Sequence, residues 1–162
     1  QVRWSPPPPS SLKVNFDGTT FQDVGRADLG VVIRDCQGQA IASLEKQIPL
    51  PFTSNMVEAL ATTRAISFAL EIGCSSFILE GDSEQVIKSL SCNEDSFTPL
   101  GNILASAKAL TDFSRISFSH VHRLGNSVAH NLVKHARHVS SYSVWMEDVP
   151  LHFYSVLLVD AG

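Results

Sequence analysis

Three carboxylates stand at positions where a folded chain could bring them to one point. Asp17 and Asp82 each lie beside a glycine at the end of an expected β-strand. Glu58 lies in the first turn of an expected helix between those strands. In open α/β sheets ligands bind just outside the strand ends. If the two strands are neighbours, Asp17 and Asp82 project side by side and Glu58 lies over them.

Such a cluster predicts a particular chemistry. Three carboxylates at one point cannot all stay ionised unless a cation neutralises them. Carboxylate oxygens favour Mg²⁺ or Mn²⁺ over zinc. Two such ions about 4 Å apart stabilise the attacking and leaving oxygens of an in-line phosphoryl displacement. The chain contains no glycine-rich phosphate loop and no nucleophile–histidine–acid pattern that would favour another reaction.

Each acid alone also has a structural explanation. An aspartate before a glycine, as at Asp17, is a common turn former. A glutamate in a first helical turn, as at Glu58, interacts favourably with the helix dipole. Asp82 could act as an ordinary helix N-cap before Ser83. Their joint occurrence, in this order and on these elements, favours the metal site.

The hydrophobic periodicity predicts five strands and four helices around these acids. The expected strands are 12–17, 29–35, 40–48, 76–80 and 115–121, and the expected helices are 56–72, 83–90, 97–113 and 126–139. The first three strands follow one another closely, as in an antiparallel meander. Helices separate the other two, so the pattern predicts an α/β fold, a mixed sheet with helices on its faces.

Composition limits the class of protein. The 162 residues are 44% hydrophobic and 17% charged, enough for one domain with a sizeable core. The net charge of −4 excludes a strongly basic protein that coats nucleic acid. Three cysteines predict no disulfide framework. With no signal peptide or membrane span in the pattern, we expect an intracellular protein of the nucleus or cytoplasm.

The chain divides into three expected parts. Residues 1–10 contain four consecutive prolines and predict a proline-rich linker. Residues 11–140 hold the strands, the helices and the three acids. Residues 141–162 form an apolar tail that we expect to pack on this domain.

Several stretches together resemble one family. KVNFDGT, VVIRD, NMVEALA, FILEGDSEQVI and HVHRLGNSVAHNLVKHA are similar to the ribonuclease H domains of plant reverse-transcriptase-like proteins, many of which derive from non-LTR retrotransposons. The resemblance implies a ribonuclease H-like fold with a five-stranded mixed sheet, three antiparallel strands and then two parallel ones, and helices on both faces. It also implies a metal-dependent endonuclease that hydrolyses the RNA strand of RNA–DNA hybrids by a two-metal mechanism.

The resemblance assigns metal-holding and catalytic roles to four positions. Asp17, Glu58 and Asp82 match the acids that hold two Mg²⁺ or Mn²⁺ ions in the family. The fourth acidic position is occupied here by His130. A neutral imidazole is a weaker ligand than a carboxylate for these ions, so the second ion is expected to bind less tightly and activity to be weakened.

The resemblance further implies residues that contact nucleic acid. These are Gly18, Thr19, Ser54, Asn55, Ser83, Arg123 and Asn126. Arg123 would replace a histidine-bearing loop that this chain lacks, and Asn126 could instead be a helix N-cap. Between Asp82 and the last expected strand the chain carries only two lysines, so hybrid binding should be modest and salt-sensitive.

Two readings of function stay open at this stage. The first is the hybrid-cleaving nuclease, a monomer that could work beside a neighbouring reverse-transcriptase domain of a longer polyprotein. The second is a catalytically weak or inactive module of the same fold, serving as a nucleic-acid-binding or protein-interaction scaffold. The net negative charge and His130 favour the second, and the intact set of three acids favours the first.

Overall fold

The computed structural model describes residues 3–49, 53–92, 98–112, 115–138, 142–150 and 154–161. Its strands are β1 (Leu12–Phe21), β2 (Arg26–Arg34), β3 (Ala40–Pro49), β4 (Ser76–Gly81), β5 (Arg115–His120) and β6 (Tyr142–Met146). Its helices are α1 (Ser54–Glu71), α2 (Glu84–Ser91), α3 (Pro99–Thr111), α4 (Ser127–Ala136) and α5 (Tyr154–Ala161), with short 3₁₀ helices η1 (Gln22–Val24) and η2 (Arg123–Asn126). Residues 97, 113 and 139, at the ends of predicted helices, lie outside the described ranges.

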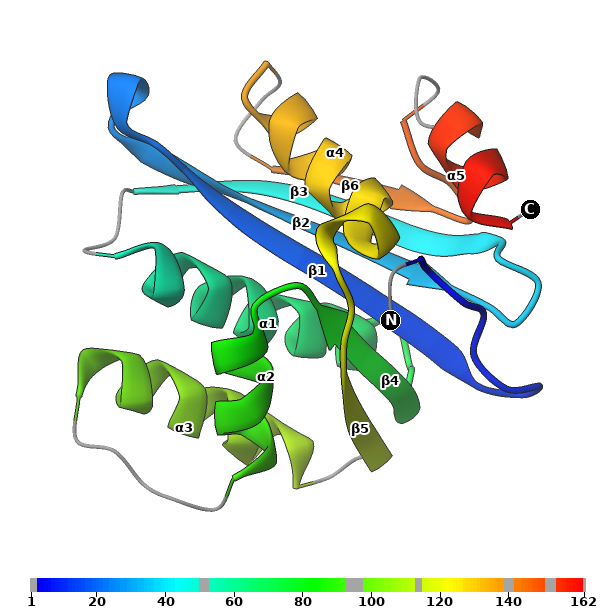
Figure 1. Ribbon diagram of the computed structural model, residues 1–162, viewed down its shortest axis with the longest axis horizontal. Helices are drawn as coiled ribbons and strands as arrows, with labels where there is room; N and C mark the ends of the chain where they lie inside the picture. The colour runs from blue at the N-terminus through cyan, green and yellow to red at the C-terminus, as the bar shows by residue number, and fades with distance from the viewer. Residues whose placement is uncertain are drawn as a thin grey trace.

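The strands form one mixed sheet in the order β5-β4-β1-β2-β3-β6 (Figure 1). β1, β2 and β3 pair antiparallel, while β4 pairs parallel with both β1 and β5. This confirms the α/β class, the antiparallel meander and the expected neighbourhood of the first and fourth strands. The predicted number of five strands is wrong, because β6 pairs antiparallel with β3 and adds a sixth. Its five residues form a strand only through that pairing, which a local pattern does not reveal.

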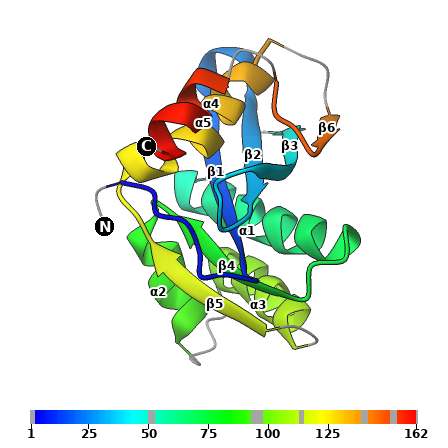
Figure 2. The same cartoon turned by 90° about the vertical axis from the view of Figure 1, so that its right-hand side faces the viewer.

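Helices lie on both faces of the sheet, as expected (Figures 1 and 2). α1, α2 and α3 lie on one face, and α4 crosses β1, β2 and β3 on the other. α1 approaches the sheet with small side chains, since Ala61, Ala65 and Ala69 are fully buried. No helix in the described part of the chain is long and apolar enough to cross a membrane.

β1 does not end at Asp17, as the sequence predicted, but continues to Phe21. Gly18 is therefore part of the strand and not its end. A Cβ at Gly18 would lie 2.7 Å from Cγ1 of Val57, so the glycine is what lets α1 come this close to β1. β4 pairs with β1 only as far as Asn15, which leaves the edge of β1 beside Asp17 open to side chains from other elements.

A second glycine sets the position of α4. Gly30 in β2 lies directly opposite Asp17 in β1. A Cβ at Gly30 would lie 2.6 Å from the backbone oxygen of Ala129, in the first turn of α4. The glycine therefore allows α4 to pack against the sheet next to Asp17, with His130 following Ala129 in the chain.

The two ends of the chain also contact this domain. Trp4, within the proline-rich segment, is only 5% exposed. At the other end, Val156 and Leu157 of α5 pack against the buried cluster between β2 and α4. The assignment of 1–10 as a proline-rich linker that enters the domain remains a prediction, as does the boundary of the tail at 141.

Candidate metal centre

Three carboxylates from three different elements meet beside the open edge of β1. Asp17 lies in β1, Glu58 in the second turn of α1, and Asp82 immediately after β4. One oxygen from each lies within 4.8 Å of the others, and among the described residues these three form the group that could hold a metal ion. The parallel pairing of β4 with β1 is what brings Asp82 to Asp17. The sequence-predicted acids are thus together in the fold.

The cluster is largely shielded from water. Asp17 is fully buried and Glu58 is 9% exposed. Burial, reinforced by the charges of Asp17 and Asp82, raises the pKa of Glu58 to about 9, while the backbone N–H of Gly18 works in the opposite direction. Without another positive charge at this point, Glu58 therefore holds a proton at neutral pH.

Two buried oxygens of the cluster have no hydrogen-bond donor. They are Oδ1 of Asp17 and Oε2 of Glu58. Without metal, the proton that Glu58 retains can be shared with Asp17, and a divalent cation would replace it and bind both oxygens. The donor set is made of oxygens alone, which suits Mg²⁺ or Mn²⁺. The residues present therefore fit a hard divalent cation.

His130 of α4 is brought directly to the cluster. Its Nδ1 lies 2.6 Å from Oδ2 of Asp17, and its side chain is 16% exposed. The imidazole thus bonds one oxygen of Asp17 and leaves the other, Oδ1, without a donor. It supplies a hydrogen bond where a fourth carboxylate would supply a negative charge.

Arg123 brings a positive charge to the rim. Its Nε donates to Oδ2 of Asp82 at 2.8 Å, and one terminal nitrogen lies 3.4 Å from Nδ1 of His130. The Arg123 side chain is 58% exposed, so the guanidinium remains accessible to an anion from solvent. The backbone oxygen of Asp82 is also 3.3 Å from Nε2 of His120.

Most of the other residues expected to contact nucleic acid lie near the acids in the chain and are not buried. Gly18 and Thr19 are half-buried in β1, Ser54 is exposed at the start of α1, and Asn55 is half-buried beside it. Asn55 donates to Oε1 of Gln85 at 2.9 Å, which links the start of α1 to α2.

Ser83 has a structural role in addition to its place beside Asp82. It is the N-cap of α2, where its hydroxyl oxygen accepts from the backbone N–H of Val86 at 3.5 Å. The cap fixes the direction in which the chain leaves β4 and so the position of Asp82. Ser83 remains half-buried and reachable at the edge of the site.

Asn126 lies at the start of α4, as expected, but its side chain has neither of the expected roles. It is fully buried, away from a nucleic acid at the surface, and makes no N-cap hydrogen bond. Instead Nδ2 donates to the backbone oxygen of Phe16 at 2.8 Å, and Oδ1 accepts from Asn15 at 3.2 Å. The residue anchors the start of α4 to β1, just before Asp17.

Sequence reasoning missed a buried polar network behind the acids. Asn15 and Lys13 of β1 both donate to Glu80 of β4, at 3.0 and 3.1 Å. Ser119 of β5 donates to the same carboxylate at 2.9 Å. The signal was present as polar residues alternating with apolar ones along β1, but the same alternation is typical of a strand with one side facing solvent.

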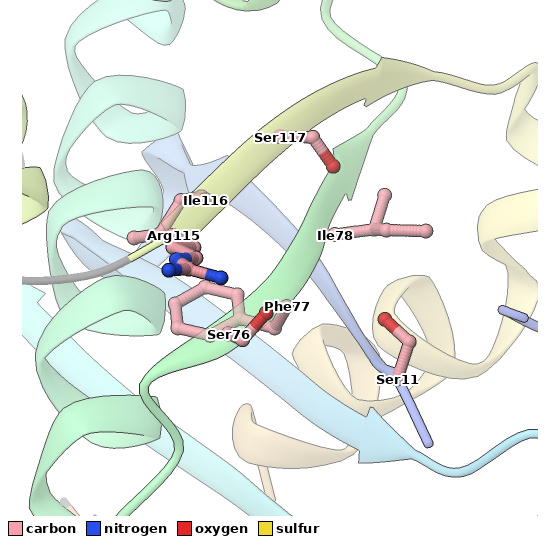
Figure 3. A pocket seen from close by; sticks show the side chains of 7 residues that line it. All are labelled: Ser11, Ser76, Phe77, Ile78, Arg115, Ile116 and Ser117. Atoms are coloured by element: carbon pink, nitrogen blue, oxygen red, sulfur yellow. The ribbon is translucent and has the colours of Figure 1, made fainter. Parts of the chain in front are cut away.

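A separate cavity of about 290 Å³ lies at the opposite ends of β4 and β5 from the carboxylates. Figure 3 shows Ser11, Ile78 and Ser117 among the side chains that line it. None of the acids of the cluster lines this cavity, so it is not part of the metal centre.

Comparisons with known proteins agree with this geometry. A family model described as reverse transcriptase-like matches residues 15–136. Ribonuclease H1 of the archaeon Halobacterium salinarum is 29% identical, with a TM-score of 0.72 over 80% of this chain and 98% of that one. A search among curated proteins found no match.

Two further solved structures share the fold. LC11-RNase H1, isolated from compost and solved in complex with an RNA/DNA hybrid, is 23% identical, with a TM-score of 0.69 over 77% of this chain and 95% of that one. The protease-reverse transcriptase of prototype foamy virus is 17% identical, with a TM-score of 0.56 over 80% of this chain and 21% of the viral one.

Proposed function

This chain belongs to the reverse transcriptase-like family and carries a ribonuclease H-like domain, and we propose that it is a metal-dependent endonuclease that hydrolyses the RNA strand of RNA–DNA hybrids. The observation that carries the proposal is the meeting of Asp17, Glu58 and Asp82 within 4.8 Å, with unpartnered buried oxygens on two of them. The hybrid as substrate is supported by LC11-RNase H1, which was solved with one.

Asp17, Glu58 and Asp82 would hold the cations, with His130 beside them as the fourth, weaker position. Two Mg²⁺ or Mn²⁺ ions, when bound, would supply charge neutralisation of the phosphate and activation of a water for in-line attack. Asp17 is the natural shared ligand, because it lies within reach of both Glu58 and His130. Glu58 must lose the proton that its raised pKa retains, so occupancy of the site releases a proton.

Arg123 would meet the scissile phosphate. It is an exposed cation at the rim, and a guanidinium offers five donors in a geometry that suits phosphate oxygens. Its bond to Asp82 orients the planar group while leaving most of the side chain open to solvent. Arg123 thus binds and orients the substrate and stabilises the negative charge that develops as the phosphodiester bond breaks.

Polar groups at the start of α1 and along β1 would recognise the hybrid. Ser54 and Asn55 lie ahead of Glu58 on α1, Gly18 and Thr19 follow Asp17, and Ser83 follows Asp82. Hydroxyl and amide groups can bond to the 2′-hydroxyl, the group that distinguishes RNA from DNA. The preference for an RNA strand is assigned to these contacts.

The protein is acidic overall, with a net charge of −4. Phosphate binding strengthens with the number of cations that a protein presents. We therefore propose that affinity for a hybrid is modest on its own and that a neighbouring reverse-transcriptase domain supplies further contacts. The family description and the likeness to a viral protease-reverse transcriptase support that context.

One observation favours a second function, a catalytically weak or inactive scaffold. Arg123 and His130 both contact the acids directly, so the protein's own side chains partly satisfy a cluster that otherwise needs a metal ion. A domain that has lost catalysis could keep such a cluster folded. The two functions differ in whether the protein cuts a hybrid, and a scaffold whose acids are already satisfied would also bind no divalent cation.

The deciding experiment is cleavage of a labelled RNA–DNA hybrid in Mg²⁺ or Mn²⁺ at low salt. We expect wild-type protein to cut the RNA strand internally and Asp17→Asn to be inactive. Asp112→Asn, at the exposed C-terminal end of α3, is the matched control and should cut normally. A folded wild-type protein that neither cuts the hybrid nor gains thermal stability in Mn²⁺ would favour the scaffold.

A further inference from the structure

The buried side chain of Trp4 attaches the N-terminal segment to the domain, beside a hydrogen bond from Nζ of Lys13 to the backbone oxygen of Ser5 at 2.8 Å. The indole Nε1 of Trp4 donates to Oδ1 of Asn15 at 3.0 Å. The guanidinium carbon of Arg34 lies 3.7 Å from the ring centroid, and Nζ of Lys13 lies 5.6 Å from it. Both cations are almost completely buried. A tryptophan held by a buried hydrogen bond and by cation–π contacts is firmly fixed in position.

Asn15, which accepts the indole hydrogen bond, is also connected by hydrogen bonds to the metal centre. Asn15 donates through Nδ2 to Oδ1 of Asn126 at 3.2 Å. Asn126 in turn donates to the backbone oxygen of Phe16 at 2.8 Å, the carbonyl of the peptide bond that joins Phe16 to Asp17. A continuous line of buried hydrogen bonds therefore runs from Trp4 to the backbone beside Asp17.

A second contact joins the N-terminal segment to the surroundings of the metal centre, this time through the backbone. A Cβ at Gly125 would lie 2.8 Å from both the carbonyl carbon of Arg3 and the amide nitrogen of Trp4. Gly125 belongs to η2, the turn that starts with Arg123 and leads into α4 and His130. The N-terminal segment thus lies directly on the turn that presents Arg123 and His130 to the acids.

We propose that Trp4 is a positioning residue of the metal centre, which fixes the turn from Arg123 to Asn126, and with it His130, relative to Asp17. The effect runs through Asn15 and Asn126 and through the backbone contact at Gly125. The inference rests on the proposed function for its consequence on cleavage, while its consequence for metal binding can be measured without any substrate.

The chain contains two tryptophans, which provides a matched control. Trp145 lies in β6, separated from β1 by β3 and β2. Trp4→Phe keeps an aromatic ring over Arg34 but removes the N–H donor, and Trp4→Ala removes both. Trp145→Phe makes the same change at a distance from the acids.

The first measurement is the Mn²⁺ dissociation constant by titration calorimetry, with circular dichroism to check folding. We expect Trp4→Ala to bind Mn²⁺ about tenfold more weakly, the scale on which residues behind a metal's ligands change affinity. Trp4→Phe should fall between Trp4→Ala and wild type, and Trp145→Phe should equal wild type. If Trp4→Ala does not fold, Trp4→Phe decides the question by itself.

The second measurement uses the reciprocity of coupled sites. In Trp145→Phe the only indole is Trp4, and we expect its fluorescence emission to shift when Mg²⁺ binds. In Trp4→Phe the only indole is Trp145, whose emission should stay constant. Mg²⁺ is used because it is not a paramagnetic quencher. Cleavage assays should show a lower kcat in Trp4→Phe with little change in KM for the hybrid.

The outcomes separate this inference from the proposed function. Equal Mn²⁺ affinity in wild type and in folded Trp4 variants, with Trp4 emission unaffected by Mg²⁺, would overturn the positioning role and leave the metal centre intact. Absence of any Mn²⁺ binding by wild type would overturn the metal centre and this role together. A third outcome is that the Trp4 variants bind Mn²⁺ more weakly while even the wild type cuts no hybrid. That outcome would support the positioning role and contradict only the nuclease.

Discussion

Nδ1 of His130 lies 2.6 Å from Oδ2 of Asp17, so an imidazole contacts the buried acid at the position where the family resemblance implies a fourth carboxylate. The contact has opposite consequences in the two states of the site. Without a metal ion, a hydrogen-bond donor beside Asp17 stabilises its negative charge. With a metal ion, a neutral ring attracts the cation less than a carboxylate would.

His130→Asp tests both consequences in one variant. We expect it to lower the melting temperature of the metal-free protein, because it adds a fourth negative charge to a buried cluster. We expect it to tighten Mn²⁺ binding about tenfold, on the scale of other changes around metal ligands, and to increase hybrid cleavage. Calorimetric titration and a cleavage assay measure these effects. His130→Asn, which adds no charge, is the control, and equal Mn²⁺ affinity in the two variants would contradict the prediction.

Asp17→Asn should remove stabilisation by metal. A ligand that binds only the folded state at 100 times its dissociation constant stabilises it by about 2.7 kcal/mol. Wild type should gain stability of that order in excess Mn²⁺, and Asp17→Asn should gain none. The metal-free variant should also hold Glu58 at a lower pKa, because Asp17 is one of the charges that raise it. Thermal unfolding with and without Mn²⁺ measures the gain, and an undiminished gain in Asp17→Asn would exclude it as a ligand.

The stability of the metal-free protein should fall as pH rises from about 4.5 toward 9. Burial raises the pKa of Glu58 to about 9, and burial together with the charge of Asp28 raises the pKa of Glu45 to about 8. Between the ordinary and the raised pKa the folded state holds more protons than the unfolded state. Each group therefore lowers the free energy of unfolding by up to about 1.4 kcal/mol per pH unit in that window.

Glu45→Gln separates the contribution of Glu45 to this pH dependence from that of Glu58. Glu45, two strands from Asp17 and outside the carboxylate cluster, shares a hydrogen bond with Nδ1 of His135 at 2.7 Å, and a glutamine side chain can still bond there. We expect Glu45→Gln to flatten the pH dependence up to pH 8 and to leave Mn²⁺ affinity unchanged. Urea unfolding at pH 6 and pH 8.5 without metal measures the slope. A slope identical to that of wild type would show that Glu45 ionises normally in the folded state.

Gly30→Ala should disturb the metal centre without touching a ligand. The added Cβ would lie 2.6 Å from the backbone oxygen of Ala129, and no change of side-chain rotamer can relieve a backbone contact. We expect a loss of about 1–3 kcal/mol in stability and weaker Mn²⁺ binding, because α4 must move away from Asp17 and carry His130 with it. Chemical unfolding and Mn²⁺ titration measure both.

Gly25→Ala is the matched control for that variant. Gly25 has a φ of 64°, and a Cβ added there would meet no atom within 4 Å, so alanine introduces only backbone strain of roughly 1 kcal/mol. It should lower stability and leave Mn²⁺ affinity as in wild type. If Gly30→Ala and Gly25→Ala lose Mn²⁺ affinity equally, the loss is a general effect of lower stability, and the role of α4 packing is contradicted.

The sequence by itself was sufficient for the order of strands and helices through residue 136 and for the three acids. Alternation along β1 and β3, and the long stretch from α1 to Gly73 without glycine or proline, are local patterns that each element must satisfy. The acids were recognisable because Asp17, Glu58 and Asp82 are all carboxylates and lie at the ends of expected elements. Residue types and short spacings are carried in the chain whatever its tertiary structure.

Only the tertiary structure decided what the polar residues do. Asn126 bonds to Asn15 across 111 positions and to Phe16 across 110, so its burial could not be read from its neighbours in the chain. Gly18 marks a close approach to α1 and not a strand end, and β6 exists only because β3 provides a partner. Trp4 is buried for the same reason, because its indole bonds to Asn15. Each of these outcomes depends on which distant groups meet, and local periodicity contains no information about that.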